Sequence, residues 1–289
     1  MCSFDVTLDG RNAHVANLSL NINRELQAIT EWLEINKLSL NIKKTKFMIF
    51  HFPQRNIKNF NPNIQIKSRP IQRVTLFDFL GLIIDENLSW TPHLQKITSK
   101  ISRTLGVMNR LKRFLPAYIL MHIYNSLILP HLQSFILIWG HKSSKVFRLQ
   151  KRAIQMLTLS RYNARTEPLF KRLNLLKVED MFSINILKFY FKYKHGTLPV
   201  YFQNMFPLVS HNYNTRGNLN KIRMNKRTTA NCENIIRNSL PRIVEKFPLS
   251  VLEKIETHSF NGFKNYVKKV MLDNYDPLCH RLNCFICNH

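Results

Sequence analysis

The chain has 289 residues and a mass of 34.3 kDa, enough for one large domain or two ordinary ones, and its hydrophobic content of 45% can supply a core. Lys and Arg number 43 against 17 Asp and Glu, so the formal net charge is +26 and the pI is about 10.2. This balance excludes an ordinary soluble enzyme that works without a polyanion nearby.

The first predicted element is an amphipathic helix at residues 17–36, and two short strands follow it. Apolar residues recur in the helix at three- and four-residue spacing, which places them on one face. These residues are Leu18, Ile22, Leu26, Ile29 and Leu33. Apolar runs at 47–50 and 79–84 indicate the two strands, with a polar, proline-containing loop at 51–70 between them.

A second helix is expected after residue 90, because Thr91 suits the N-cap and Pro92 suits the first helical position. Its core face is formed by Leu94, Ile97, Ile101, Leu105, Met108 and Leu111. Its other faces and its end carry the cations Lys96, Lys100, Arg103, Arg110, Lys112 and Arg113. The pattern predicts a helix that packs through one face and has a cationic exterior.

Residues 114–140 carry no charged side chain, and a segment of this length could span a bilayer. Pro130 falls in its middle, and polar residues interrupt its apolar surface. These polar residues are His122, Asn125, Ser126, His131, Gln133 and Ser134. We therefore expect a buried pair of core helices here and no membrane partner.

Further helices are predicted from Ser143 or Ser144 to Leu159, at 167–173 and at 178–194, where Gly196 supplies a helix stop. The first of them should point Lys145, Arg148, Lys151 and Arg152 outward. Residues 198–227 read as a basic linker, and residues 231–272 as a small helical C-terminal unit. With only seven glycines and dominant helical periods, the predicted fold class is α+β, mostly helical, with a small sheet near the front.

The cations are concentrated in two stretches that contain no acidic residue. Thirteen Lys and Arg lie between Glu86 and Glu167, and eight more lie between Met181 and Cys232. This distribution favours RNA or DNA as the partner, bound through its phosphates without sequence specificity. An acidic membrane or protein surface is the alternative partner, and a merely solvated basic surface is the simplest explanation.

Two short strings, KLSLN at 37–41 and KTKFMIF at 44–50, lie around the first predicted strand. They resemble the palm of the family of non-LTR (LINE-type, jockey-like) retrotransposon reverse transcriptases. FLGLIID at 79–85 and LSW at 88–90 are similar to the strand and turn where its primer grip is expected. HNYNTR at 211–216, NSLP at 238–241 and FK at 263–264 resemble strings beyond its thumb, so the resemblance covers nearly the whole chain.

The resemblance implies three regions and an activity. Residues 1–90 would be a late-palm remnant, residues 91–197 a helical thumb-like region, and residues 198–289 a basic linker and small helical C-terminal region with a Cys/His-rich tail. Intact members of the family are RNA-directed DNA polymerases that use Mg²⁺. We expect an intracellular location, in the nucleus or cytoplasm, because no secretory signal begins the chain and its cysteines form no dispersed disulfide framework.

The resemblance also implies that most catalytic carboxylates are missing. Phosphoryl transfer onto a growing strand needs several carboxylates, because they must hold two Mg²⁺ ions close together. The family's Ala-Asp-Asp-type turn corresponds to CSFDVT at 2–7, where Phe4 stands at one aspartate position and only Asp5 remains. Asp5 is therefore interpreted as an inactive relic, with a loop or capping role, or a metal ligand within a larger assembly, as alternatives.

The candidate nucleic-acid-binding residues are the exterior cations of the two thumb-like helices and two lysines of the palm-like region. Lys44 and Lys46 lie where the family places a lysine that helps to neutralise phosphates, although a solvated surface is the simpler explanation. Trp32, Trp90 and Trp139 lie in or beside apolar patterns and are expected in the core. No nucleophile triad, phosphate-binding loop or dinucleotide motif is visible.

The last eleven residues carry a possible zinc site. Cys279, Cys284, Cys287 and His289 have C-x4-C-x2-C-x-H spacing, and four such ligands suit tetrahedral zinc. Reduced thiols without a metal are the alternative, because zinc ribbons and fingers normally have a second, well-separated ligand pair. Apart from this zinc, we expect the chain to need no cofactor of its own.

The first functional hypothesis is a truncated, reverse-transcriptase-like protein that is catalytically inactive by itself and binds RNA or DNA through its basic helices. The second is an incomplete gene model of an active RNA-directed DNA polymerase. The third is a membrane-associated basic protein anchored by residues 114–140.

Overall fold

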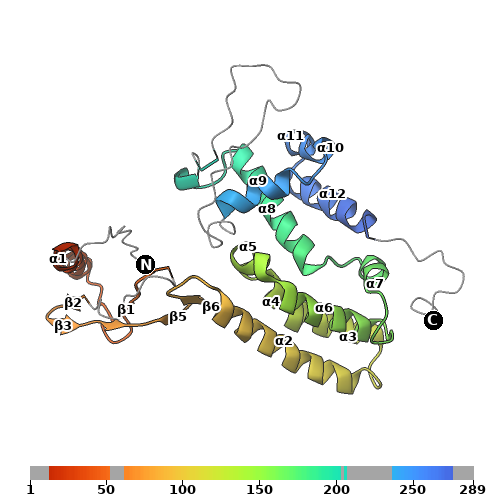
Figure 1. The fold of residues 1–289 in the computed structure, drawn as a ribbon, viewed down its shortest axis with the longest axis horizontal. Helices are drawn as coiled ribbons and strands as arrows, with labels where there is room; N and C mark the ends of the chain where they lie inside the picture. Colours follow the sequence, from red (N-terminus) through yellow and green to blue (C-terminus); the bar gives the residue numbers. More distant parts are fainter. Residues whose placement is uncertain (1–12, 53–61, 203–204, 207–235, 276–289) are drawn as a thin grey trace, which may run out of the picture. The chain divides into compact units, whose positions relative to one another are not determined.

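The structure is a computed structural model, and it describes residues 13–52, 62–202, 205–206 and 236–275 (Figure 1). The chain divides into two compact units, Met1–His93 and Leu94–His289. The described part is mostly helical and contains three two-stranded sheets, which confirms the predicted mostly helical α+β class.

The first unit is built on a small apolar cluster beneath a long helix, α1 (Ala13–Ile35). This helix confirms the one predicted at 17–36. Ile22 and Leu26 of α1 pack against a buried cluster made of Ile64, Ile66 and Ile71. The helical period in the sequence therefore identified the buried face of α1.

The strands of the first unit are shorter and differently arranged than predicted. β1 (Lys46–Phe47) pairs in parallel with β4 (Gln72–Arg73), so only one residue of the strand predicted at 47–50 is in a strand. β2 (Gln65–Ile66) and β3 (Arg69–Pro70) form an antiparallel pair within the segment predicted as a loop. Residues 53–61 of that segment lie outside the described residues.

The single strand predicted at 79–84 is wrong, because this segment contains the turn of a hairpin. β5 (Leu76–Phe79) pairs antiparallel with β6 (Leu82–Asp85), and Leu80 and Gly81 connect them with φ of 50° and 94°. A two-residue hairpin turn with both central residues at positive φ matches the right-handed twist of its strands. Gly81 adopts this conformation at little cost, and the apolar neighbours of Gly81 concealed the turn in the sequence.

The second unit begins with a long helix that is followed by a bent helix. The long helix is α2 (Thr91–Leu111), and residues 112–116 connect it to the bent helix. The bent helix consists of α3 (Ala117–Ile123), a π-helical turn η1 (Tyr124–Ile128) and α4 (Leu129–Gln133). α5 (Ile136–Trp139) and a 3-10 turn η2 (Gly140–Lys142) complete the uncharged segment. No helix in the described ranges has both the length and the apolar character needed to cross a membrane.

The bent helix α3–η1–α4 buries one side chain per turn, as the core-helix interpretation of this segment requires. These side chains are Leu120, Tyr124, Ile128 and Leu132, all fully buried. Pro130 cannot donate a backbone hydrogen bond, and its ring conflicts with the carbonyl four residues earlier. The π-helical turn lies directly before α4, whose second residue is Pro130, and it rewinds the helix around this conflict.

The later helices pack around α8 (Val178–Lys194), which contacts α5, α6 (Ser144–Leu157), α9 (Ile236–Val244) and α12 (Phe260–Asp273). The remaining short elements are α7 (Glu167–Arg172), η3 (Val200–Phe202), α10 (Leu249–Leu252) and α11 (Lys254–Thr257). In Figure 1, α2, the α3–α4 segment and α6 run side by side. The predicted helices at 143–159, 167–173 and 178–194 are confirmed, whereas residues 207–235 of the predicted linker and C-terminal unit lie outside the described part.

The three tryptophans differ in burial. Trp139 is fully buried, as predicted, and its indole Nε1 donates to the carbonyl of Ser134 over 2.8 Å. Trp90 is half-buried. Trp32 is 58% exposed, so its placement in the core was wrong. Trp32 follows Ile29 by three residues, but the packed face of α1 leads through Ile22 and Leu26, and Trp32 falls beside that face.

Four helices of the described part end in one backbone motif, although glycine is present in only one of them. After α8, the N–H of Thr197 donates to Lys192 and that of Gly196 to Tyr193, with Gly196 at φ 63°. The same pair of hydrogen bonds ends α1, α6 and α7. The left-handed residues at these ends are Lys37, Leu159 and Asn174.

A buried glutamine joins α6 to η1 and to the start of α8. The Nε2 atom of Gln150 on α6 donates to the Tyr124 hydroxyl over 3.1 Å and to the carbonyl of Leu176 over 2.9 Å. Its Oε1 atom accepts from the N–H of Val178, the first residue of α8, over 2.8 Å. Burial raises the pKa of Tyr124 to about 12, so this phenol stays protonated at neutral pH.

A close approach between η2 and α8 predicts opposite effects of alanine at two glycines. A Cβ atom added at Gly140 would lie 2.5 Å from Cδ2 of Phe182, so Gly140→Ala should lower the free energy of unfolding by about 1–3 kcal/mol. Gly106, within α2, has nothing within 4 Å of an added Cβ, so Gly106→Ala should raise it by about 0.5–1 kcal/mol. Urea unfolding followed by circular dichroism measures both, and equal changes of one sign would contradict the close approach.

Candidate nucleic-acid interface

The cations of α2 form one stripe along the helix. Successive α-helical residues are turned by about 100°, so the 96, 100, 103, 107 and 110 positions fall within a sector of about 80°. Lys96, Lys100, Arg103 and Arg110 occupy four of these positions, and Val107, which is 50% exposed, occupies the fifth. We call these four cations the α2 stripe.

The roll of α2 is set by its apolar face. Ile97, Ile101, Leu105 and Met108 are buried to 5% exposure or less. Their packing leaves Arg103 and Arg110 exposed and Lys96 and Lys100 half-buried. Among the described residues, Lys100, Arg103 and Arg110 form no ion pair with a carboxylate, so their charge is available to a polyanion.

A histidine of α4 lies in the electrostatic field of the α2 stripe. The pKa of His131 is lowered below its ordinary value of 6.5, first by burial and then by the positive charges of Lys100 and Lys96. The bent helix α3–η1–α4 therefore places the imidazole of His131 near Lys96 and Lys100, which are more than thirty residues away in sequence. No sequence signal singled out His131, because its role depends on this tertiary contact.

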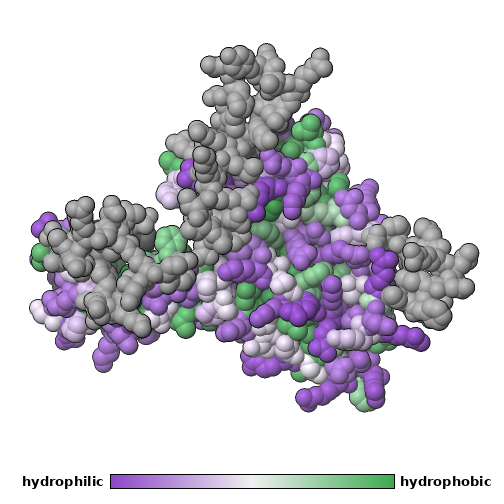
Figure 2. Space-filling view, viewed as in Figure 1, coloured by the Kyte–Doolittle hydropathy of each residue, from purple (hydrophilic) through white to green (hydrophobic). Residues whose placement is uncertain are grey.

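α6 presents a second cationic face. Lys145, Arg148 and Arg152 are exposed, and their spacing puts them on one side of the helix, away from the buried Val146, Ala153 and Leu157. The fourth predicted cation, Lys151, turns aside and lies over the ring of Phe147, 4.4 Å from its centroid. In Figure 2, hydrophilic side chains cover much of the visible face of the unit that contains α2 and α6.

Lys112 and Arg113 directly follow α2 and are not part of the stripe. Lys112 is half-buried, and its N–H continues the helical hydrogen bonding to Met108 over 2.9 Å. Arg113 is exposed beside Phe114, whose side chain is 82% exposed. This pair of cations extends the basic surface into the turn before α3.

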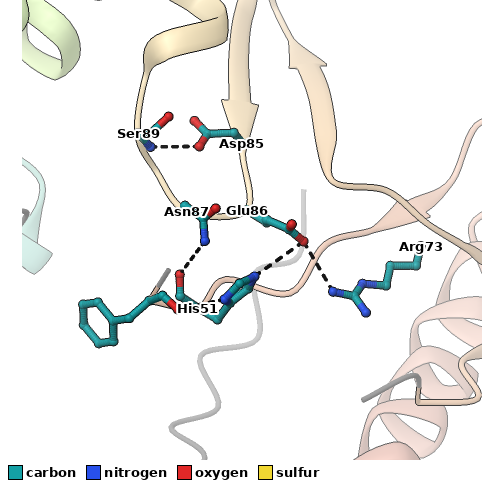
Figure 3. A network of polar contacts seen from close by, with 7 residues as sticks. His51, Arg73, Asp85, Glu86, Asn87 and Ser89 are labelled. Atoms are coloured by element: carbon teal, nitrogen blue, oxygen red, sulfur yellow. Dashed lines mark hydrogen bonds and ion pairs between the residues drawn. The ribbon is translucent and has the colours of Figure 1, made fainter. Parts of the chain in front are cut away.

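Carboxylates of the first unit position the segment that leads into α2 (Figure 3). Asp85 is 7% exposed, and its two oxygens accept from the N–H groups of Ser89 and Trp90 over 2.9 and 3.0 Å. Glu86 lies 3.3 Å from Nη2 of Arg73 and 3.7 Å from Nε2 of His51. These acids hold a turn in shape, a role that the sequence had not revealed.

Lys44 and Lys46, the two lysines predicted to neutralise phosphates, belong to the first unit. The Nζ atom of Lys46, on β1, donates to Oε1 of Gln72 on the paired strand β4 over 2.6 Å. Lys44 is exposed in the turn before β1, and its N–H binds Asn41. Lys46 is thus engaged in a contact across the sheet, and Lys44 points into solvent.

The remaining predicted site residues lie outside the described residues. These are Asp5 and the candidate zinc ligands Cys279, Cys284, Cys287 and His289. Within the described ranges, no three His, Cys, Asp or Glu side chains come together as a metal site. The cationic surface formed by the α2 stripe and the exposed cations of α6 is therefore the site that the described residues define best.

Comparison with family models, with curated proteins and with solved structures finds no match to this chain. The described features that bear on function are the α2 stripe, His131 and the cationic face of α6.

The position of His131 predicts a pH dependence of polyanion binding. A phosphate near Lys96 and Lys100 would offset their charge and raise the pKa of His131, so binding takes up protons. Affinity for a DNA duplex should therefore rise as the pH falls below 6.5, measured by fluorescence anisotropy at constant salt. His131→Gln should flatten this rise, and His122→Gln, at an exposed position of α3, should keep it. Equal pH profiles for all three proteins would contradict this prediction.

Proposed function

We propose that this chain is a catalytically inactive, reverse-transcriptase-like protein that binds RNA or DNA through phosphate contacts. In this proposal it corresponds to the late palm, thumb and C-terminal region of a LINE-type retrotransposon enzyme. The observation that carries the binding function is the α2 stripe, a row of cations on a helix whose opposite side is anchored in a core. The strings in the sequence support the family, and no separate comparison supports it.

The dimensions of the α2 stripe suit a phosphate backbone. From Lys96 to Arg110 the helix rises about 21 Å, a length that corresponds to about six base pairs of duplex. Lys and Arg bound to phosphates release counterions, which supplies affinity without sequence information. Phosphate contacts of this kind support binding without base specificity.

The proposed lack of polymerase activity rests on the small number of carboxylates available to hold metal ions. Two-metal phosphoryl transfer needs a cluster of carboxylates, and the strings that resemble the family leave Asp5 alone at the catalytic turn. Asp85, the last residue of β6, accepts from two backbone N–H groups. Glu86, the next residue, pairs with Arg73 and His51. These two carboxylates are therefore not free to replace the missing ligands.

Charge removal on α2 tests the binding function. The triple variant Lys100→Gln, Arg103→Gln, Arg110→Gln should bind a DNA duplex about ten- to a hundredfold more weakly at about 0.1 M salt. The slope of log affinity against log salt should become shallower by about 2–3, because up to three phosphate contacts are lost. Fluorescence anisotropy over a salt series measures both quantities.

A matched variant separates the α2 stripe from net charge. Arg237, Lys246 and Lys269 are exposed on the C-terminal helices or directly after them, and their replacement by Gln removes the same three charges. This control should change affinity by less than about threefold. If both triple variants weaken binding equally, the basic surface acts as a whole and the α2 stripe has no special role. A wild-type chain without any salt-dependent duplex binding would refute the proposal.

A primer-extension assay tests the proposed inactivity. The full chain, supplied with a primed RNA template, Mg²⁺ and deoxynucleotides, should incorporate no nucleotide above the level of a buffer control, because too few carboxylates remain to hold the metals. An intact retroviral reverse transcriptase in the same mixture is the positive control. Template-dependent extension that is lost on Asp5→Asn would overturn the interpretation of Asp5 as a relic.

A further inference from the structure

The connection between α6 and α7 presents one aromatic ring to solvent. Tyr162 is 76% exposed, although burial of its ring would be favoured by the hydrophobic effect. The side chain of Gln155, a residue that is 9% exposed, holds the backbone around Tyr162. Nε2 of Gln155 donates to the carbonyls of Tyr162 and Ala164 over 2.7 and 3.2 Å. The ring is therefore held outward by a backbone that is itself anchored.

Further hydrogen bonds stabilise this connection. The N–H of Ser160 donates to the carbonyl of Gln155 over 3.0 Å, and the hydroxyls of Thr158 and Ser160 lie 2.8 Å apart. The N–H of Ala164 closes a turn onto the carbonyl of Arg161 over 3.0 Å. None of these contacts uses the side chain of Tyr162, so the fold of the connection does not explain the choice of tyrosine.

One cation lies over the exposed ring, and others lie on α6 and directly before the ring in the sequence. The guanidinium of Arg152 lies over it, with Cζ 5.5 Å from the ring centroid, which leaves the opposite face of the ring for another group. Lys145, Arg148 and Arg152 lead along α6 toward this ring, and Arg161 is exposed directly before it. Phosphates that follow these cations would bring their bases to Tyr162.

We infer that Tyr162 and Arg152 form a stacking platform for an unpaired base, so that α6 binds single-stranded nucleic acid. This inference rests on the proposed function and adds the class of ligand to it. Proteins that bind single strands without sequence preference combine a cationic track with aromatic rings on which bases stack. A base inside a duplex is already stacked on both sides and cannot use the ring, so Tyr162 should distinguish the two forms.

The test compares two ligands of the full chain by fluorescence anisotropy at one salt concentration: a single-stranded oligothymidine of about twenty nucleotides and a duplex of equal length. Tyr162→Ala should weaken binding of the single strand about five- to hundredfold, the range for loss of one base–aromatic stack, and change duplex binding less than about twofold. Tyr162→Phe should bind like the wild type, because stacking needs the ring and not the hydroxyl. Tyr201→Ala, at a residue 81% exposed on η3, is the matched control and should alter neither ligand.

Each other outcome is also decisive. Equal weakening of both ligands by Tyr162→Ala, or no weakening of either, overturns the stacking platform while the proposed binding function stands. A wild-type chain that binds neither oligonucleotide removes the proposed function together with this inference. Binding of polyglutamate in place of both oligonucleotides would assign the surface to an acidic protein partner. Circular dichroism should show an unchanged fold, because the hydrogen bonds that hold this connection use only the backbone of Tyr162.

Discussion

The basic face of this protein depends on a buried amide, the side chain of Gln150. Its three hydrogen bonds join α6 to η1 and to the start of α8, where the Tyr124 hydroxyl, the Leu176 carbonyl and the Val178 N–H belong to buried residues. Leaving such a group without a partner costs about 1–3 kcal/mol, so a rotation of α6 that breaks all three bonds is strongly disfavoured. The roll of α6 is thereby fixed, and with it the outward direction of Lys145, Arg148 and Arg152.

The helices could be predicted from the sequence because their apolar period is regular, and α8 was predicted with both ends correct. Its end at Gly196 carries the usual glycine, whereas Lys37, Leu159 and Asn174 adopt the same left-handed conformation without that signal. The hairpin at Leu80 and Gly81 was missed for the opposite reason. There the glycine is present, but it lies inside an apolar run that reads as one strand.

The site could be predicted in its composition and not in its geometry. An acid-free stretch with helical spacing was enough to identify the cations of α2 and α6. The contributions of His131, Asp85 and Gln155 arise from contacts with other elements or with backbone groups beyond their own helix or strand. The period of the apolar residues predicts which face of a helix or strand is buried, but it does not predict which other element packs against that face.

The few acids of the chain explain why so many cations stay unneutralised. Glu167 lies 2.7 Å from Nζ of Lys177, and Asp180 accepts from the Tyr275 hydroxyl over 2.5 Å, which fastens the end of α12 to the start of α8. Burial raises the pKa of Asp180, because the charged carboxylate loses hydration, and the Tyr275 hydroxyl and Lys177 partly oppose this shift. Acids used in this way stabilise packing and leave the cations of α2 and α6 to repel one another. A polyanion bound as proposed would relieve that repulsion and thereby stabilise the fold.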